Sequence, residues 1–149
     1  MAGPADRPGL VILSLYRAAV AQPAVIRIAE KFAAVGDHWN PRIVAELNGQ
    51  HVKIVKFAGR FAWHHHVEED ELLLVVRGRL RMGVRDEAGE RWLEVGPGEM
   101  IVIPRGLDHC PESMPLEEEA HVLLFEPVST VNTGNAVSDA RTRFEVDRL

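Results

Sequence analysis

The sequence predicts an all-β domain built as a sandwich or barrel, and three observations support this fold class. From about residue 42 onward the apolar runs are short and rich in Val, Ile and Leu. Residues that favour turns separate these runs at intervals of roughly ten residues. No long helical stripe interrupts the runs, so a parallel sheet with helices between its strands is not expected.

Length and composition predict one domain. The chain has 149 residues, of which 46% are hydrophobic, which is enough for one core and too little for two. We expect this single domain over residues 24–149, including a C-terminal tail. Residues 1–23 are rich in Ala, Gly and Pro and are interpreted as a leader or frayed N-terminus. Their apolar stretch, residues 10–16, is too brief for a signal peptide or a membrane span.

Charge and cysteine content narrow the expected partners and compartment. The 17 Lys and Arg residues against 22 Asp and Glu give a formal net charge of -5, and no basic run is interleaved with aromatics. Nucleic acid is therefore not an expected partner. Cys110 is the single cysteine, so no intramolecular disulfide can form, which fits a reducing, cytoplasmic setting.

The strands can be placed from turn chemistry. Residues 42–47 and 51–57 flank Asn48-Gly49, the strongest short hairpin signal, because both residues tolerate positive φ. Further strands are expected at residues 72–77, 79–85, 91–95, 100–103 and 120–126. Residues 24–35 fit either a strand or a helical turn. From Pro127 onward Ser, Thr, Asn and Gly dominate, which predicts an extended tail that packs on the barrel or pairs with another subunit.

Two segments carry the residues with chemical potential. In a strand His64 and His66 point the same way, and Glu71 shares a face with Leu73 and Val75 at the rim of an apolar interior. A His-x-His pair alone is more often a surface feature. A second segment, residues 98–109, combines a strand, a rigid Pro-x-Gly turn and a third histidine, His109.

Together these segments resemble the two motifs of the cupin superfamily. Gly59, His64, His66, Glu71 and Gly78 fill the first motif, and Gly98, Pro104, Gly106 and His109 fill the second. The spacing from Gly59 to His64 is one residue short of the family's usual pattern, and Ser113 stands where the family often has Asn. The resemblance covers about residues 42–126.

The resemblance implies a fold, a ligand set and an assembly. The fold would be a cupin double-stranded β-helix, a jelly-roll barrel, here with a short N-terminal extension. The metal ligands would be His64, His66, Glu71 and His109. Family habit also predicts a homodimer.

Three imidazoles and one carboxylate suit Mn, Fe, Co, Ni or Zn better than Ca or Mg. The function expected on this basis is a metal-dependent enzyme of isomerase, lyase or dioxygenase type that acts on a small polar metabolite. The alternative is a non-catalytic cupin that binds a small ligand as a sensor, storage or accessory protein.

Proton-transfer groups beside the metal would favour the enzymatic function over the non-catalytic one. The candidates are His51, Asp70 and His121, with Glu69 a further acidic neighbour. Each has a simpler explanation. His51 follows a tight turn and is expected to be exposed, Asp70 lies in an acidic loop, and His121 is expected to be a hydrogen-bonded core residue. Cys110 is expected to face away from the metal as a small core residue.

Overall fold

The computed structural model describes residues 22–149, which form one short helix and eight strands. The predicted leader at residues 1–23 lies almost entirely outside the described residues. The elements are α1 (Ile28–Ala33), β1 (Arg42–Leu47), β2 (Gln50–Phe57), β3 (Glu71–Arg77), β4 (Leu80–Asp86), β5 (Gly89–Val95), β6 (Met100–Ile103), β7 (Asp108–Ser113) and β8 (Ala120–Pro127).

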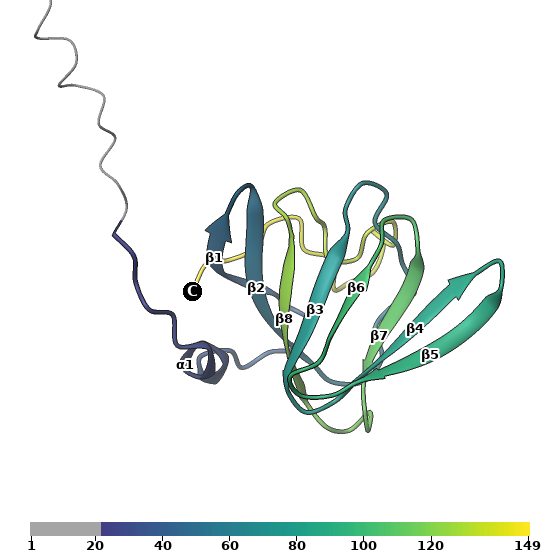
Figure 1. Ribbon diagram of the computed structural model, residues 1–149, viewed down its shortest axis with the longest axis horizontal. Coiled ribbons are helices and arrows are strands. Elements are labelled where there is room, and N and C mark those ends of the chain that lie inside the picture. Colours follow the sequence, from purple (N-terminus) through teal and green to yellow (C-terminus); the bar gives the residue numbers. More distant parts are fainter. Residues whose placement is uncertain (1–21) are drawn as a thin grey trace, which may run out of the picture.

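The strands form two antiparallel sheets that face each other, as the family resemblance predicted (Figure 1). The larger sheet has the order β1-β2-β8-β3-β6, and the smaller has the order β5-β4-β7. Strands that are neighbours in space are thus mostly distant in sequence, as in a jelly roll. The inner faces of both sheets supply one core, whose largest side chains include Phe57, Leu73, Leu80 and Met82.

The predicted hairpin at Asn48-Gly49 is confirmed. β1 and β2 pair antiparallel, with Leu47 opposite Gln50. Asn48 has φ 51° and Gly49 has φ 75°, the two positive values that this two-residue turn requires. The other predicted strands also appear within two residues of their expected bounds.

In one segment the structure differs from the sequence-based prediction, and in another it decides between two alternatives. β7 was expected only as a turn and a histidine; the structure makes it the edge strand of the smaller sheet, where Pro111 is tolerated because isolated bridges rather than a continuous ladder flank the outer side. Residues 24–35 contain a helix rather than a strand: α1 packs Phe32 and the following Val35 on Ile54, on the outer face of β2.

The C-terminal tail packs on the barrel. Asn135 donates its backbone N–H to the carbonyl of His65. Leu149 donates its backbone N–H to the carbonyl of Ile43. The tail therefore covers the same end of the barrel from which residues 64–66 project. Within residues 22–149, no helix is long and apolar enough to cross a membrane.

Candidate metal centre

His64 and His109 face each other across an isolated β-bridge. His64 N lies 3.0 Å from His109 O, and His109 N lies 2.8 Å from His64 O. This reciprocal pair places both side chains on one face of the ladder. Their ring centroids are 4.2 Å apart.

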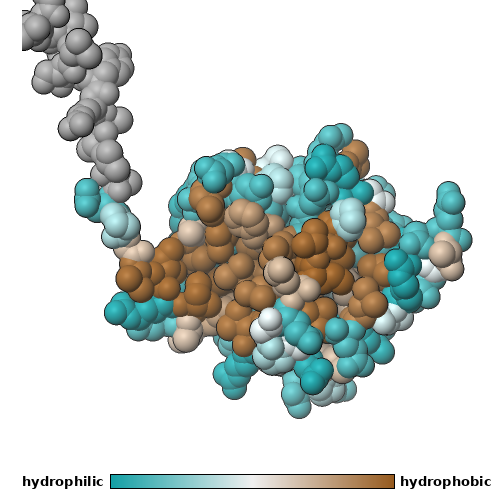
Figure 2. Space-filling model, in the orientation of Figure 1, coloured by the Kyte–Doolittle hydropathy of each residue, from teal (hydrophilic) through white to brown (hydrophobic). Residues whose placement is uncertain are grey.

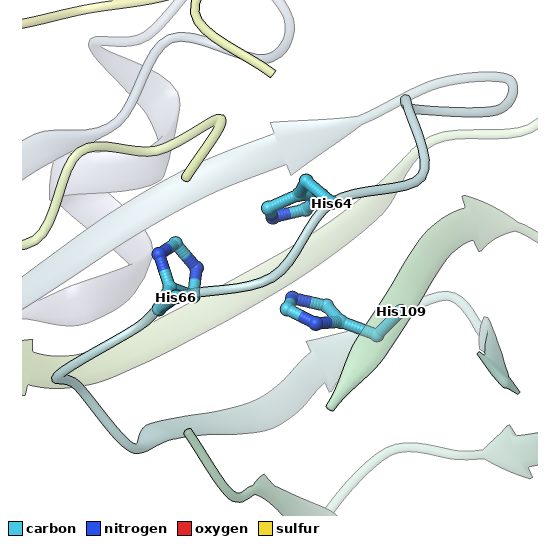
Figure 3. A group of neighbouring side chains, drawn as sticks. All are labelled: His64, His66 and His109. Atoms are coloured by element: carbon cyan, nitrogen blue, oxygen red, sulfur yellow. The ribbon is translucent and has the colours of Figure 1, made fainter. Parts of the chain in front are cut away.

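His66 reaches the same point from the same segment as His64. It follows two residues later, so strand alternation returns its side chain to the inner face. The carbonyl of His66 accepts a 2.7 Å hydrogen bond from the N–H of Gly106, which ties this segment to the turn before β7. One ligand nitrogen from each of the three buried rings lies within 4.8 Å of the others (Figure 3).

Backbone carbonyls orient two of the rings. His64 Nδ1 donates to Ala62 O at 2.9 Å, and His109 Nδ1 donates to Leu107 O at 2.9 Å. Since a carbonyl oxygen can only accept, Nδ1 carries the hydrogen in each ring. In the neutral form Nε2 is then the free lone pair, which is the state a metal ligand needs.

Glu71 lies beside this histidine cluster. It opens β3 on the same inner face as Leu73 and Val75, as alternation predicted. Its Oε2 is 3.3 Å from His109 Nε2 and 3.6 Å from His66 Nε2. Two ligands that each bind one ion at about 2.1 Å are separated by about 3.0–3.4 Å at right or tetrahedral angles, so these distances suit a shared cation.

The buried nitrogens favour an occupant for the cluster. His66 Nε2 and His109 Nε2 are buried and have no hydrogen-bond partner, because their contacts with Glu71 lack hydrogen-bond geometry. Buried polar atoms without partners are costly and rare in folded proteins. A divalent metal bound by the three imidazoles and the carboxylate would satisfy these atoms, so the donor set fits the cation that the sequence predicted.

An apolar pocket adjoins the cluster. His64 and Glu71 form part of its wall, and Asn132 of the C-terminal tail is the third polar residue there. The other lining residues are aromatic, aliphatic or proline: Trp39, Pro41, Val55, Phe57, Phe61, Leu73, Pro111 and Leu124.

Three of the sequence-predicted proton-transfer candidates, Asp70, His121 and Glu69, bind partners other than the three clustered rings. Asp70 is bound at the surface by Arg105 at 3.1 Å. His121 lies on the outer face of the larger sheet rather than in the core; its ring stacks on Phe32 of α1, with Nε2 2.6 Å from Glu119. Glu69 accepts a 2.8 Å hydrogen bond from Ser129.

His51 is more buried than expected. Its Nε2 lies 3.6 Å from Glu46, and its Nδ1 is buried without a partner. Cys110 is a fully buried core residue, as expected, and its Sγ donates to the carbonyl of Phe61.

Sequence reasoning missed a buried ion pair next to Glu71. Lys53 Nζ lies 2.8 Å from Glu126 Oε1, and both side chains are 1% exposed. Leu72 pairs with Phe125, so Glu126 follows one step along the ladder as the neighbour of Glu71. The signal was present in the sequence, because Lys53 shares the inward parity of Val55 and Phe57.

The two facing sheets and the inward histidine cluster define a jelly-roll protein of the cupin class. The chain belongs to the cupin domain family, whose model matches residues 51–126.

The uncharacterized protein YdbB of Bacillus subtilis strain 168 is 30% identical over 66 residues, which are 44% of this chain and 56% of YdbB. The chain thus matches little more than half the length of this curated relative.

Two solved structures resemble the chain over nearly their whole length. A cupin-2 domain protein from Shewanella frigidimarina is 38% identical with a TM-score of 0.63, covering 69% of this chain and 94% of that one. Protein NMB1881 from Neisseria meningitidis is 28% identical with a TM-score of 0.60, covering 70% and 99% respectively.

Proposed function

We propose that the protein is a divalent-metal-binding cupin whose metal centre acts as an enzyme on a small molecule. The observation that supports this proposal most directly is the set of three buried imidazoles and one carboxylate that converge while two of their nitrogens lack partners. His64, His66, Glu71 and His109 would hold one ion of Mn, Fe, Co, Ni or Zn.

The bound metal would supply Lewis acidity toward an oxygen donor, or electron transfer if the ion is iron. Isomerase or lyase chemistry would follow in the first case, and dioxygenase chemistry in the second. The chain itself fixes ring orientation through the carbonyls of Ala62 and Leu107. The apolar lining beside His64 offers water few hydrogen-bonding groups at the position where a substrate would approach.

Elemental analysis of protein purified without added metal tests the ligand set. We expect about one equivalent of a transition metal in the wild-type chain and less than about a tenth of that in the double variant His64→Ala/His109→Ala. The far-UV spectrum should remain that of a β protein, because these rings lie at the rim of a large core.

A matched double variant controls for the loss of two histidines. His38→Ala/His121→Ala removes two rings from the outer surface, where both contact Glu119. This variant should retain wild-type metal content. Full metal content in His64→Ala/His109→Ala would place the metal site elsewhere.

A further inference from the structure

We propose that the substrate is a small, largely apolar molecule, planar where it meets the pocket wall, with one oxygen-rich end directed at the metal. This inference rests on the proposed metal site and replaces the polar metabolite expected from the sequence. It follows from the pocket beside His64 and Glu71, whose wall offers a ligand almost no hydrogen-bonding group of its own.

The polar groups of the pocket wall are already engaged. The side-chain amide of Asn132 donates to Arg141 O at 2.9 Å, and its oxygen accepts from Arg143 N at 2.7 Å. The indole N–H of Trp39 donates to Ala58 O at 2.9 Å. Only His64 and Glu71 remain among the lining residues, and both belong to the proposed metal centre.

A substrate with several hydroxyl groups would therefore bind poorly. Each hydroxyl buried against this wall would lose its water and gain no partner, a cost that weakens binding several-fold or more per group. A molecule with one chelating end avoids this cost because its polar atoms meet the metal. Its remaining surface then gains from leaving water.

The aromatic part of the wall favours a planar group. The ring of Trp39 stacks on Phe57 at 4.4 Å and on Phe61 at 4.7 Å between centroids. Phe61 also meets the ring of His64 edge-on at 5.4 Å, which links this wall directly to the cluster. Flat aromatic surfaces pack well against a further flat, apolar group.

Trp39 is held at this wall at a backbone cost. Its φ is 57°, in the left-handed region that bulky residues rarely adopt. Its backbone N–H donates to Lys56 O at 2.9 Å, which secures this conformation. Such strain is concentrated at binding and catalytic sites, and here it holds the indole against the pocket.

The pocket limits the size of the occupant. Its empty volume is about 360 Å³ even when the space open to solvent is counted. Only about 30 Å³ of this space is free for a solvent-sized molecule, so a ring enters only where the lining side chains move aside. The occupant is thus a compact molecule, on the order of one ring with its chelating group.

Three hydroxamates with one shared metal-binding head test the proposal on the metal-loaded, full-length protein. Acetohydroxamate carries a methyl group, benzohydroxamate a phenyl ring, and D-gluconohydroxamate a polyhydroxylated chain. By titration calorimetry we expect benzohydroxamate to bind roughly ten- to a hundredfold more tightly than acetohydroxamate, as burial of a ring predicts. D-gluconohydroxamate should bind most weakly.

A pair of matched variants separates a pocket effect from a general loss of stability. Val55→Thr introduces a hydroxyl into the pocket wall without a large change in volume, and Val75→Thr does the same in the core away from the pocket. Val55→Thr should reduce the preference for phenyl over methyl several-fold. Val75→Thr should leave that preference unchanged.

The outcomes distinguish this inference from the metal site on which it rests. If the protein binds no metal, the metal-centre proposal and this inference both fall. Metal binding without binding of any hydroxamate leaves the metal site standing and overturns this inference. Equal affinity for the methyl and phenyl compounds, or tighter binding of the polyhydroxylated one, overturns the substrate class alone. An equal loss of preference in both valine variants would also overturn it.

Discussion

His109 holds the proton with which a metal ion would compete in the histidine cluster. Burial lowers the pKa of His109, but the contact and charge of Glu71 more than offset this effect, so the pKa is raised above its usual 6.5. The pKa of His64 is lowered to about 4, by burial first and then by the neighbouring His109. His64 is therefore neutral near pH 7, whereas His109 keeps its proton to a higher pH than a free imidazole does.

Metal affinity should accordingly rise with pH. Binding must displace the proton of His109, so the apparent affinity should fall about tenfold per pH unit once the pH is below the pKa of that ring. Competition with a metal-sensitive dye between pH 6 and 8 measures this slope. An affinity that is constant over this range would argue against His109 as a ligand.

The Lys53–Glu126 pair should contribute strongly to stability when only one member is removed. Burial, followed by the charge of Glu71, raises the pKa of Glu126 to about 7, although Lys53 acts in the opposite direction. Lys53→Met would leave a buried carboxylate without its partner and lower the free energy of unfolding by about 3–5 kcal/mol at pH 8. The loss should be smaller at pH 5, where Glu126 can take up a proton.

Urea unfolding of three variants checks this expectation. Lys53→Met should be the least stable at pH 8, and the double variant Lys53→Met/Glu126→Leu should recover much of the loss, because apolar side chains then fill the same space. A double variant as unstable as the single one would show that packing, rather than the unpaired charge, explains the effect.

Among the elements, the C-terminal tail depends on a close backbone approach at Gly134. Its φ is 48°, and a Cβ there would lie 2.1 Å from the carbonyl oxygen of His65. Gly134→Ala should detach the tail locally and cost about 1–3 kcal/mol. Amide exchange of Asn135, whose N–H binds that same carbonyl, should accelerate.

Gly36 provides a matched control for this substitution. It follows α1, and a Cβ at this position would meet no atom within 4 Å. Gly36→Ala should leave the exchange of Asn135 at its wild-type rate. Equal acceleration in both variants would indicate a global loss of stability instead of a local release of the tail.

At the scale of the whole molecule, the outer face of the larger sheet is apolar over β8, β3 and β6 (Figure 2). Leu72 lies between Val102 and Phe125 in the ladder, and Leu74 lies between Met100 and Leu123. Met100 is 63% exposed and Val102 is 53% exposed. We propose that a second copy of the chain covers this face, because a continuous apolar patch on a sheet favours self-association.

Light scattering after size-exclusion chromatography tests the dimer. The wild-type chain should elute as a dimer, and Val102→Glu should produce a monomer with unchanged secondary structure. Leu93→Glu, at a 42% exposed position on the smaller sheet, is the control and should remain dimeric. A monomeric wild-type protein would end the proposal.

The parts of the fold that were predictable depend on local chemistry. Asn48-Gly49 specified a hairpin because its two residues accept positive φ, and alternation placed His64 and His66 on one face. β7 was not predicted as a strand, and only its position at a sheet edge makes Pro111 acceptable within it. Alternation along β8 shows which side chains share a face with His121, but it does not reveal which face α1 covers. His121 was therefore assigned to the core.

The sequence by itself determined most strand positions, the tight turns and the residues that resemble cupin ligands, because these follow from neighbours in the chain. Only the tertiary structure decided that His64 and His109 exchange backbone hydrogen bonds, that Lys53 meets Glu126, and that Trp39, Phe57 and Phe61 form one wall beside the cluster. These contacts join distant segments, and the energy that selects them comes from burying both sheets around one core, which no local pattern encodes.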